Sequence, residues 1–171
     1  MVEDRPQRQI TTKMENVSHE KIIEALKKIP FLGDFTDEEL SLLLKITQWL
    51  RFQPGDIIIK EGASEKNFSI ILKGNVSIRK RTGVGAYKKT ICNLSMGQSF
   101  GEMSFVTGKP RSADIVAEDE TYVLRFNSED IQKEHGNPRY APLLLKFYKK
   151  FSEILAGRLE DADKRLVNPF M

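Results

Sequence analysis

A glutamate and an arginine stand in a glycine-containing, largely apolar stretch, Gly97–Ile115, of this 171-residue chain. Glu102 directly follows Gly101, and Arg111 comes nine residues after Glu102, directly behind Pro110. A guanidinium offers a planar fork of N–H donors that suits two oxygens of one phosphate. An ionised carboxylate only accepts hydrogen bonds, so it suits a sugar hydroxyl. Together the two side chains have the chemistry of a nucleotide site.

The residues after Gly101 are compatible with an anion site. Glycine permits an unusual backbone dihedral angle, and a short helical turn behind it would leave the N–H groups of Glu102, Met103 and Ser104 available to an anion. On spacing alone, however, a salt bridge between Glu102 and Arg111 is the simpler interpretation, because this separation defines no specific motif. Both interpretations are open at this point.

Composition excludes several classes of protein. A net charge of +3 is far from the dense basic surface of a nucleic-acid binder. The single cysteine, Cys92, cannot form an internal disulfide, which fits a reducing cytosol. The polar N-terminus has no signal peptide, and no apolar run approaches the length of a membrane span. We therefore expect a cytoplasmic protein that binds neither nucleic acid nor membrane.

Two short helices are predicted ahead of the strands. Residues 1–17 are polar and lack apolar periodicity, so we interpret them as a flexible leader. A helix is expected to begin at Ser18 as N-cap and to end at Pro30. A second should begin at Thr36, because Glu39 three residues later completes a capping-box pattern.

The sequence changes character at Trp49, where short β-branched and aromatic runs alternate with turn-forming residues up to Phe126. This pattern predicts an antiparallel barrel. The fold class is α+β, mainly β: an antiparallel jelly-roll barrel with N-terminal helices and a long C-terminal helix. We expect a hairpin that turns at Gly74, and a second one with its tip between Arg79-Lys80-Arg81 and Lys88-Lys89.

Helical periodicity returns after Phe126. A short helix capped by Asn127 or Ser128 is followed by one long helix from about Tyr140 to Leu166. Its apolar residues recur every three or four positions, which suits either a dimer seam or packing on the barrel. The predicted domains are the leader, 1–17, the barrel with its flanking helices, 18–137, and a C-terminal lid or dimerisation helix, 138–171.

The segment FGEMSFVTGKPRSADIVA closely resembles the phosphate-binding cassette of the cyclic-nucleotide-binding domain family, which includes catabolite-activator-like proteins and protein kinase A regulatory subunits. The resemblance extends over about residues 20–166 and includes KIPFLGDFTDEEL, FQPGDIIIKEGA and FSIILKGNVSI. The cassette positions are filled by Phe100, Gly101, Glu102, Met103, Ser104, Phe105, Pro110, Arg111, Ser112 and Ala113.

The resemblance implies a role for each matched residue. Arg111 would hold the phosphate oxygens of a 3′,5′-cyclic nucleotide, and Glu102 would accept the ribose 2′-hydroxyl. The Ser112 hydroxyl would touch the phosphate or the base. The other implied contacts are the backbone of Gly101, Met103, Ser104 and Ala113, the barrel wall of Ile78, Ile91 and Cys92, and the lid residues Arg158, Ala162 and Asp163.

Two positions depart from the family pattern. Ser104-Phe105 replaces the usual small residue followed by leucine, and Asp114 stands where relatives carry Thr, Ser or an apolar residue. A carboxylate facing the phosphate would oppose binding. Because side chains alternate along a strand, we expect Asp114 to face solvent.

The function implied is regulatory binding of a cyclic nucleotide, cAMP in preference to cGMP, in a stand-alone, bacterial-type domain that signals through its C-terminal helix to a homodimer partner or an effector protein. The alternative is a scaffold that keeps the fold and acts through protein contacts. No enzymatic activity, metal or cofactor is expected, because His19 and His135 both lie in flanking helices and cannot build a metal cluster inside the barrel. Because the chain ends at Met171, a few residues beyond the long helix, we expect that it is not a complete helix-turn-helix transcription factor.

Overall fold

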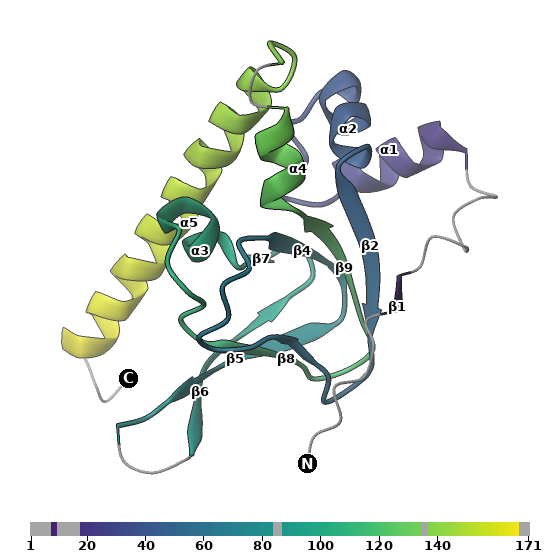
Figure 1. Ribbon diagram of the computed structural model, residues 1–171. Helices are drawn as coiled ribbons and strands as arrows, with labels where there is room; N and C mark the ends of the chain where they lie inside the picture. Colours follow the sequence, from purple (N-terminus) through teal and green to yellow (C-terminus); the bar gives the residue numbers. More distant parts are fainter. Residues whose placement is uncertain (1–7, 10–17, 84–86, 135–136, 168–171) are drawn as a thin grey trace. The chain divides into compact units, whose positions relative to one another are not determined.

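The computed structural model describes residues 8–9, 18–83, 87–134 and 137–167. The chain divides into two compact units, Met1–Lys133 and Glu134–Met171. The first unit contains all the strands and four of the helices, and the second contains the long helix α5 (Figure 1).

The strands of the first unit form two antiparallel sheets, which confirms the predicted jelly-roll architecture. One sheet has the order β1-β2-β9-β4-β7 and the other β3-β8-β5-β6. The strands are β1 (Arg8–Gln9), β2 (Thr47–Phe52), β3 (Ile57–Ile59), β4 (Phe68–Lys73), β5 (Asn75–Arg81), β6 (Lys88–Ser95), β7 (Ser99–Phe100), β8 (Asp114–Ala117) and β9 (Thr121–Phe126).

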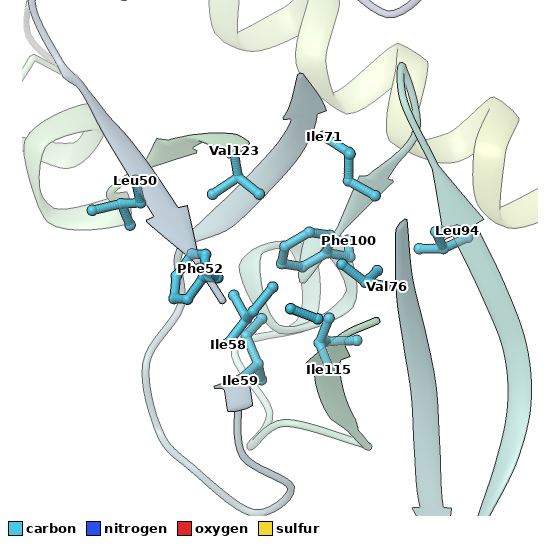
Figure 2. Packing of buried hydrophobic residues seen from close by; sticks show 11 residues of the cluster. Leu50, Phe52, Ile58, Ile59, Ile71, Val76, Leu94, Phe100, Ile115 and Val123 are labelled. Carbon is cyan, nitrogen blue, oxygen red and sulfur yellow. The ribbon is translucent and has the colours of Figure 1, made fainter. Parts of the chain in front are cut away.

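The core lies between the two sheets, and both contribute side chains to it. Figure 2 shows Phe52 and Val123 from one sheet and Ile58 and Val76 from the other pointing into the same cluster. Phe100 also belongs to this cluster and is buried. Because Phe100 is fixed in the core, the glycine and the carboxylate that follow it start from a rigid position.

The predicted N-terminal helices are confirmed as α1 (His19–Lys27) and α2 (Asp37–Leu44). Ser18 occupies the N-cap position of α1. In α2 the Thr36 side chain accepts the Glu39 amide at 3.2 Å, and the Glu39 carboxylate accepts the Thr36 amide at 2.8 Å. This is the capping box that the sequence predicts.

The predicted hairpin at Gly74 is wrong. Strands β4 and β5 flank this glycine but belong to different sheets, so the chain crosses from one sheet to the other here. Gly74 adopts φ +93°, and a Cβ there would meet a side-chain oxygen of Asp119. Asp119 accepts the Asn75 amide at 2.8 Å, so the turn before β9 holds the corner in place of a hairpin ladder.

Part of the predicted leader is structured. Arg8 and Gln9 form β1, which pairs with β2 in the register Arg8↔Arg51 and Gln9↔Leu50. The rest of the predicted leader lies outside the described residues. Polarity alone did not reveal this strand, because β1 is only two residues long and its pairing partner lies some forty residues away in sequence.

The second predicted hairpin is formed by β5 and β6, with Arg81 opposite Lys88. Its basic residues are partly neutralised: Arg79 donates to Glu118 at 2.8 Å, and Lys88 pairs with Asp114. Residues 84–86 at the tip lie outside the described residues.

The remaining helices of the first unit are α3 (Glu102–Thr107) and α4 (Ser128–Lys133). Asn127 caps α4, since its side-chain oxygen accepts the Glu129 amide at 3.2 Å. In the second unit, α5 spans Ala141–Val167, as predicted to within a residue at each end. Among the described residues, no helix combines the length and apolar character needed to cross a membrane.

Candidate functional site

Arg111 is the centre of the candidate site. Its side chain is only 4 % exposed, and its guanidinium makes three hydrogen bonds to neutral oxygens. Nη1 donates to the Gly101 carbonyl at 2.9 Å, and Nη2 donates to the carbonyl and the side-chain oxygen of Asn67 at 2.5 and 2.6 Å. Within the described residues no carboxylate lies at ion-pair distance from Arg111, and its buried Nε has no acceptor. The salt bridge to Glu102 that spacing alone favoured is therefore not formed.

The backbone of Arg111 is also fixed. Its amide donates to the Ala63 carbonyl at 2.9 Å, and its carbonyl accepts the Gly62 amide at 2.8 Å. The segment between β3 and β4 thus holds Arg111 at the main chain through Gly62 and Ala63, and at the side chain through Asn67. This double attachment restricts the guanidinium to one orientation before any ligand arrives.

Burial and nearby charges act in opposite directions on the Arg111 guanidinium. Burial lowers the pKa of the guanidinium, and Glu65 and Glu102 oppose this shift. A buried cation is stabilised by a nearby negative charge far more than an exposed one, because solvent screens it less. The three oxygens that accept hydrogen bonds from Arg111 are uncharged, so they orient the guanidinium and leave it able to pair with a phosphate.

Gly101 and Glu102 lie beside the guanidinium. Gly101 adopts φ +85° at the N-cap of α3, as the sequence predicted. A Cβ on Gly101 would meet Arg111 Nη1 and the Asn67 carbonyl, each at 2.9 Å, so only glycine leaves room for both. Glu102 opens α3 and is 1 % exposed, which places a carboxylate in the interior next to the guanidinium.

The structure also brings together further cassette residues. Ser112 is exposed, and its hydroxyl lies 3.9 Å from the sulfur of Met103, which is half-exposed on α3. Ser104 and Ala113 are buried. Residues from the two ends of the cassette therefore face each other, and their role in ligand binding stays a prediction.

The predicted wall residues lie on β5 and β6. Ile78 and Cys92 are directly opposite each other and pack against the core cluster. Ile78 is also opposite Ile115, two residues beyond Ala113, which links this wall to the cassette. Ile91 is 50 % exposed. The register passes from Ile78↔Cys92 to Arg79↔Thr90, so Ile91 is the extra residue of a β-bulge, a device that re-aims side chains.

The predicted lid residues belong to the second unit. Arg158, Ala162 and Asp163 lie on α5, where Arg158 is partly buried and the other two are exposed. Spacings of four and one place them within two turns of the helix, so one helical segment carries all three. Their contact with a ligand stays a prediction.

The orientation predicted for Asp114 is wrong. Its side chain is 4 % exposed and faces neither solvent nor an open surface. Asp114 accepts the Glu61 amide at 2.7 Å and pairs with Lys88. Alternation along a strand could not reveal this, because the partners that bury Asp114 come from other parts of the chain.

Sequence reasoning also missed two residues of this region. Asn67 has no charge and no motif that singles it out, although it makes two of the three guanidinium contacts. Arg125 on β9 is 7 % exposed, lies opposite Ser69, and has its guanidinium carbon 5.9 Å from the centre of the Phe52 ring. Burial lowers the pKa of Arg125 to about 10, with repulsion from Arg111 as the next cause. A signal existed for Arg125: a charged residue at an apolar position of a strand.

No metal site accompanies these residues. In the described part of the chain, no group of three or more His, Cys, Asp and Glu side chains could hold a metal ion. His19 is hydrogen-bonded to Ser41 at 2.8 Å in the N-terminal helices, and His135 lies outside the described residues.

Comparison with known proteins points to one family. The family model described as "Cyclic nucleotide-binding domain" matches residues 49–135, just over half of the 171-residue chain. A cyclic nucleotide-binding domain from Methylobacillus flagellatus has a similar crystal structure, with a TM-score of 0.73, 27 % sequence identity, and coverage of 90 % of this chain and 84 % of that one.

Two curated relatives show how the similarity is distributed. The cGMP-dependent 3′,5′-cGMP phosphodiesterase A of Dictyostelium discoideum is 32 % identical over 116 residues, covering 66 % of this chain and 13 % of that protein. The Cyclic AMP receptor protein of Thermus thermophilus is 30 % identical over 141 residues, covering 82 % of this chain and 62 % of that protein. In both cases this chain spans less than two thirds of the relative's length.

Proposed function

The chain belongs to the cyclic nucleotide-binding domain family, and on this basis we propose that it binds a 3′,5′-cyclic nucleotide, cAMP in preference to cGMP, as a regulatory sensor. The burial of Arg111 carries the proposal. A guanidinium 4 % exposed, held by neutral oxygens and with its Nε free of any acceptor among the described residues, suits a phosphate. Among ligands that carry a phosphate, a nucleotide also offers a ribose 2′-hydroxyl. The neighbouring Glu102 carboxylate would accept a hydrogen bond from that hydroxyl.

The remaining cassette residues complete the proposed site. Backbone groups of Gly101, Met103, Ser104 and Ala113 would contact the phosphate and ribose, with Ser112 beside them. Ile78, Ile91 and Cys92 would line the apolar side facing the base. The preference for cAMP is supported by the Thermus Cyclic AMP receptor protein, which resembles 82 % of this chain, against 66 % for the cGMP-dependent phosphodiesterase.

The proposed output runs through α5. The bound nucleotide would be approached by Arg158, Ala162 and Asp163, and this contact would change which conformation of α5 is most populated. That change would be transmitted to a second copy of the chain or to an effector protein. Such coupling is reciprocal, so a partner that prefers the liganded form also tightens nucleotide binding. Sedimentation of the protein with and without cAMP distinguishes two roles of α5. A dimer would indicate that α5 forms an interface between copies, and a monomer would indicate a lid that closes within one copy. A cytoplasmic location is proposed with it, since a single cysteine fits a reducing compartment.

A thermal-shift panel tests the function. The protein is heated with cAMP, cGMP, cyclic di-GMP and, as non-cyclic controls, 5′-AMP and 5′-GMP. A ligand at about 100 times its dissociation constant stabilises the fold by roughly 2.7 kcal/mol. We expect Tm to rise at a lower concentration of cAMP than of cGMP. The non-cyclic nucleotides should leave Tm unchanged. Unchanged Tm with every cyclic nucleotide would favour the alternative of a scaffold that acts through protein contacts.

A further inference from the structure

Asp114 is a buried carboxylate three residues beyond Arg111, at the start of β8. Its Oδ1 accepts the amide of Glu61 at 2.7 Å, and its Oδ2 pairs with Lys88 Nζ. The two oxygens of one side chain therefore join the segment after β3 to the first residue of β6.

The segment that bonds to Asp114 also holds Arg111, the proposed phosphate-binding residue. Directly after Glu61, Gly62 and Ala63 bond to the Arg111 carbonyl and amide at 2.8 and 2.9 Å. Farther along the same segment, Asn67 accepts two hydrogen bonds from the Arg111 guanidinium. Asp114 thus fixes one end of a segment that holds Arg111 through Gly62, Ala63 and Asn67.

The other partner of Asp114 belongs to the tip end of the β5–β6 hairpin, where the last residue of β5 faces the first residue of β6. Lys88 lies opposite Arg81, and the Arg81 amide donates to the Glu61 carboxylate at 3.1 Å. Lys88 Nζ also lies 3.9 Å from that carboxylate. Arg81 and Lys88 at the tip end of the hairpin therefore form one connected cluster with Asp114 and Glu61, next to the segment that holds Arg111.

We propose that Asp114 is a positioning residue of the phosphate site: it orients Arg111 through the Glu61–Asn67 segment and, through Lys88, couples that orientation to the β5–β6 hairpin. The inference rests on the proposed nucleotide-binding function. A buried carboxylate that loses its cation is left uncompensated, so the segment must rearrange to hydrate it. The coupling is reciprocal: a bound phosphate that fixes Arg111 also restrains the hairpin.

Three variants separate the two contacts of Asp114. Asp114→Leu removes both, Asp114→Asn keeps an acceptor for the Glu61 amide, and Lys88→Met removes only the cation. The matched control is Glu118→Gln, which weakens a different carboxylate–arginine contact, Arg79–Glu118 at 2.8 Å, on the neighbouring turn. Each variant is titrated calorimetrically with cAMP or cGMP, whichever wild type binds more tightly, well below its Tm.

We expect affinity to fall about tenfold for Asp114→Leu and about threefold for Asp114→Asn and Lys88→Met. The control Glu118→Gln should bind within twofold of wild type. Lys88→Arg, which keeps the cation, should recover the affinity that Lys88→Met loses. Hydrogen exchange adds a readout that a purely structural role would not move. Nucleotide should slow exchange of hairpin amides in wild type, and this protection should be lost in Lys88→Met.

The outcomes distinguish the inference from the function it rests on. A wild type that binds no cyclic nucleotide overturns both. A wild type that binds while Asp114→Asn and Lys88→Met bind equally well overturns the positioning role alone, even where Asp114→Leu fails to fold. Hairpin protection that persists in Lys88→Met overturns the coupling.

Discussion

The guanidinium of Arg111 donates to both oxygens of Asn67, to the main-chain carbonyl at 2.5 Å and to the side-chain oxygen at 2.6 Å. A single uncharged residue therefore fixes one edge of the buried Arg111 guanidinium, while the Gly101 carbonyl fixes another. Since none of these oxygens carries a full charge, Arg111 is oriented without being neutralised.

Asn67→Ala should weaken cyclic-nucleotide binding about tenfold, because it removes the side-chain oxygen that helps to orient the Arg111 guanidinium. A hydrogen bond to a charged group contributes on the order of 1.5–3 kcal/mol, and we expect part of this free energy to be lost from binding. Asn67→Asp should weaken binding further, since a carboxylate would pair with Arg111 and compete with phosphate. Asn93→Ala, an exposed amide on β6, is the control. Calorimetric titration in which Asn67→Asp binds as tightly as wild type would contradict the competition.

Gly101→Ala should both destabilise the fold and weaken binding. The left-handed backbone at φ +85° costs a non-glycine residue about 1–2 kcal/mol, and here the added Cβ also meets Arg111 and Asn67. Gly55→Ala is a matched control, because Gly55 has φ +87° with nothing within 4 Å of its Cβ position. In urea unfolding we expect Gly101→Ala to lose more stability than Gly55→Ala. Only Gly101→Ala should lose affinity, by at least tenfold, and equal losses in the two variants would show that the close approach to Arg111 is irrelevant.

Glu102→Gln should reduce affinity for a ribonucleotide about tenfold, because a neutral acceptor holds the 2′-hydroxyl less strongly than a carboxylate. A 2′-deoxy cyclic nucleotide lacks that hydroxyl, so it should bind wild type and Glu102→Gln alike. The comparison of the two ligands isolates the ribose contact. A similar loss with both ligands would place Glu102 in a structural role instead.

Acid should weaken the corner at Gly74 through Asp119. Hydrogen bonds from the side chain and then the backbone of Asn75 lower the pKa of Asp119 below its usual value of 3.8. A lowered folded-state pKa contributes stability that is present above the unfolded value and is lost as pH falls through the folded one. The urea midpoint of Asp119→Asn should therefore lie below that of wild type between pH 5 and 7, by a gap that closes below about pH 4.

Glu24→Gln, which removes an exposed carboxylate from α1, serves as the control for net charge and should follow wild type at every pH. A gap between wild type and Asp119→Asn that stays constant down to pH 2 would show that ionisation of Asp119 does not support the corner.

Local patterns predicted the helices well. The capping box at Thr36 and Glu39, and the ends of α5, were readable because their determinants lie within a few residues of each other. The same holds for the glycine that starts α3, where only one residue type tolerates the backbone angle.

Features that depend on distant partners were not readable. The turn at Gly74 looks like a hairpin because the glycine is visible, whereas the assignment of β4 and β5 to different sheets depends on β9 and β8. Asp114 looks solvent-facing until Lys88 and Glu61 are placed beside it. Asn67 is a common residue whose importance arises only from its position next to Arg111.

The phosphate-binding role of Arg111 is tested most directly by the effect of Arg111→Ala on cyclic-nucleotide binding, measured by calorimetric titration beside wild type. Lys45→Ala, which removes an exposed positive charge after α2, is the control. We predict that Arg111→Ala remains folded, as judged by its circular dichroism spectrum, and binds at least tenfold more weakly than wild type, while Lys45→Ala binds as wild type does. A folded Arg111→Ala variant with unchanged affinity would contradict the assignment of Arg111 as the phosphate-binding residue.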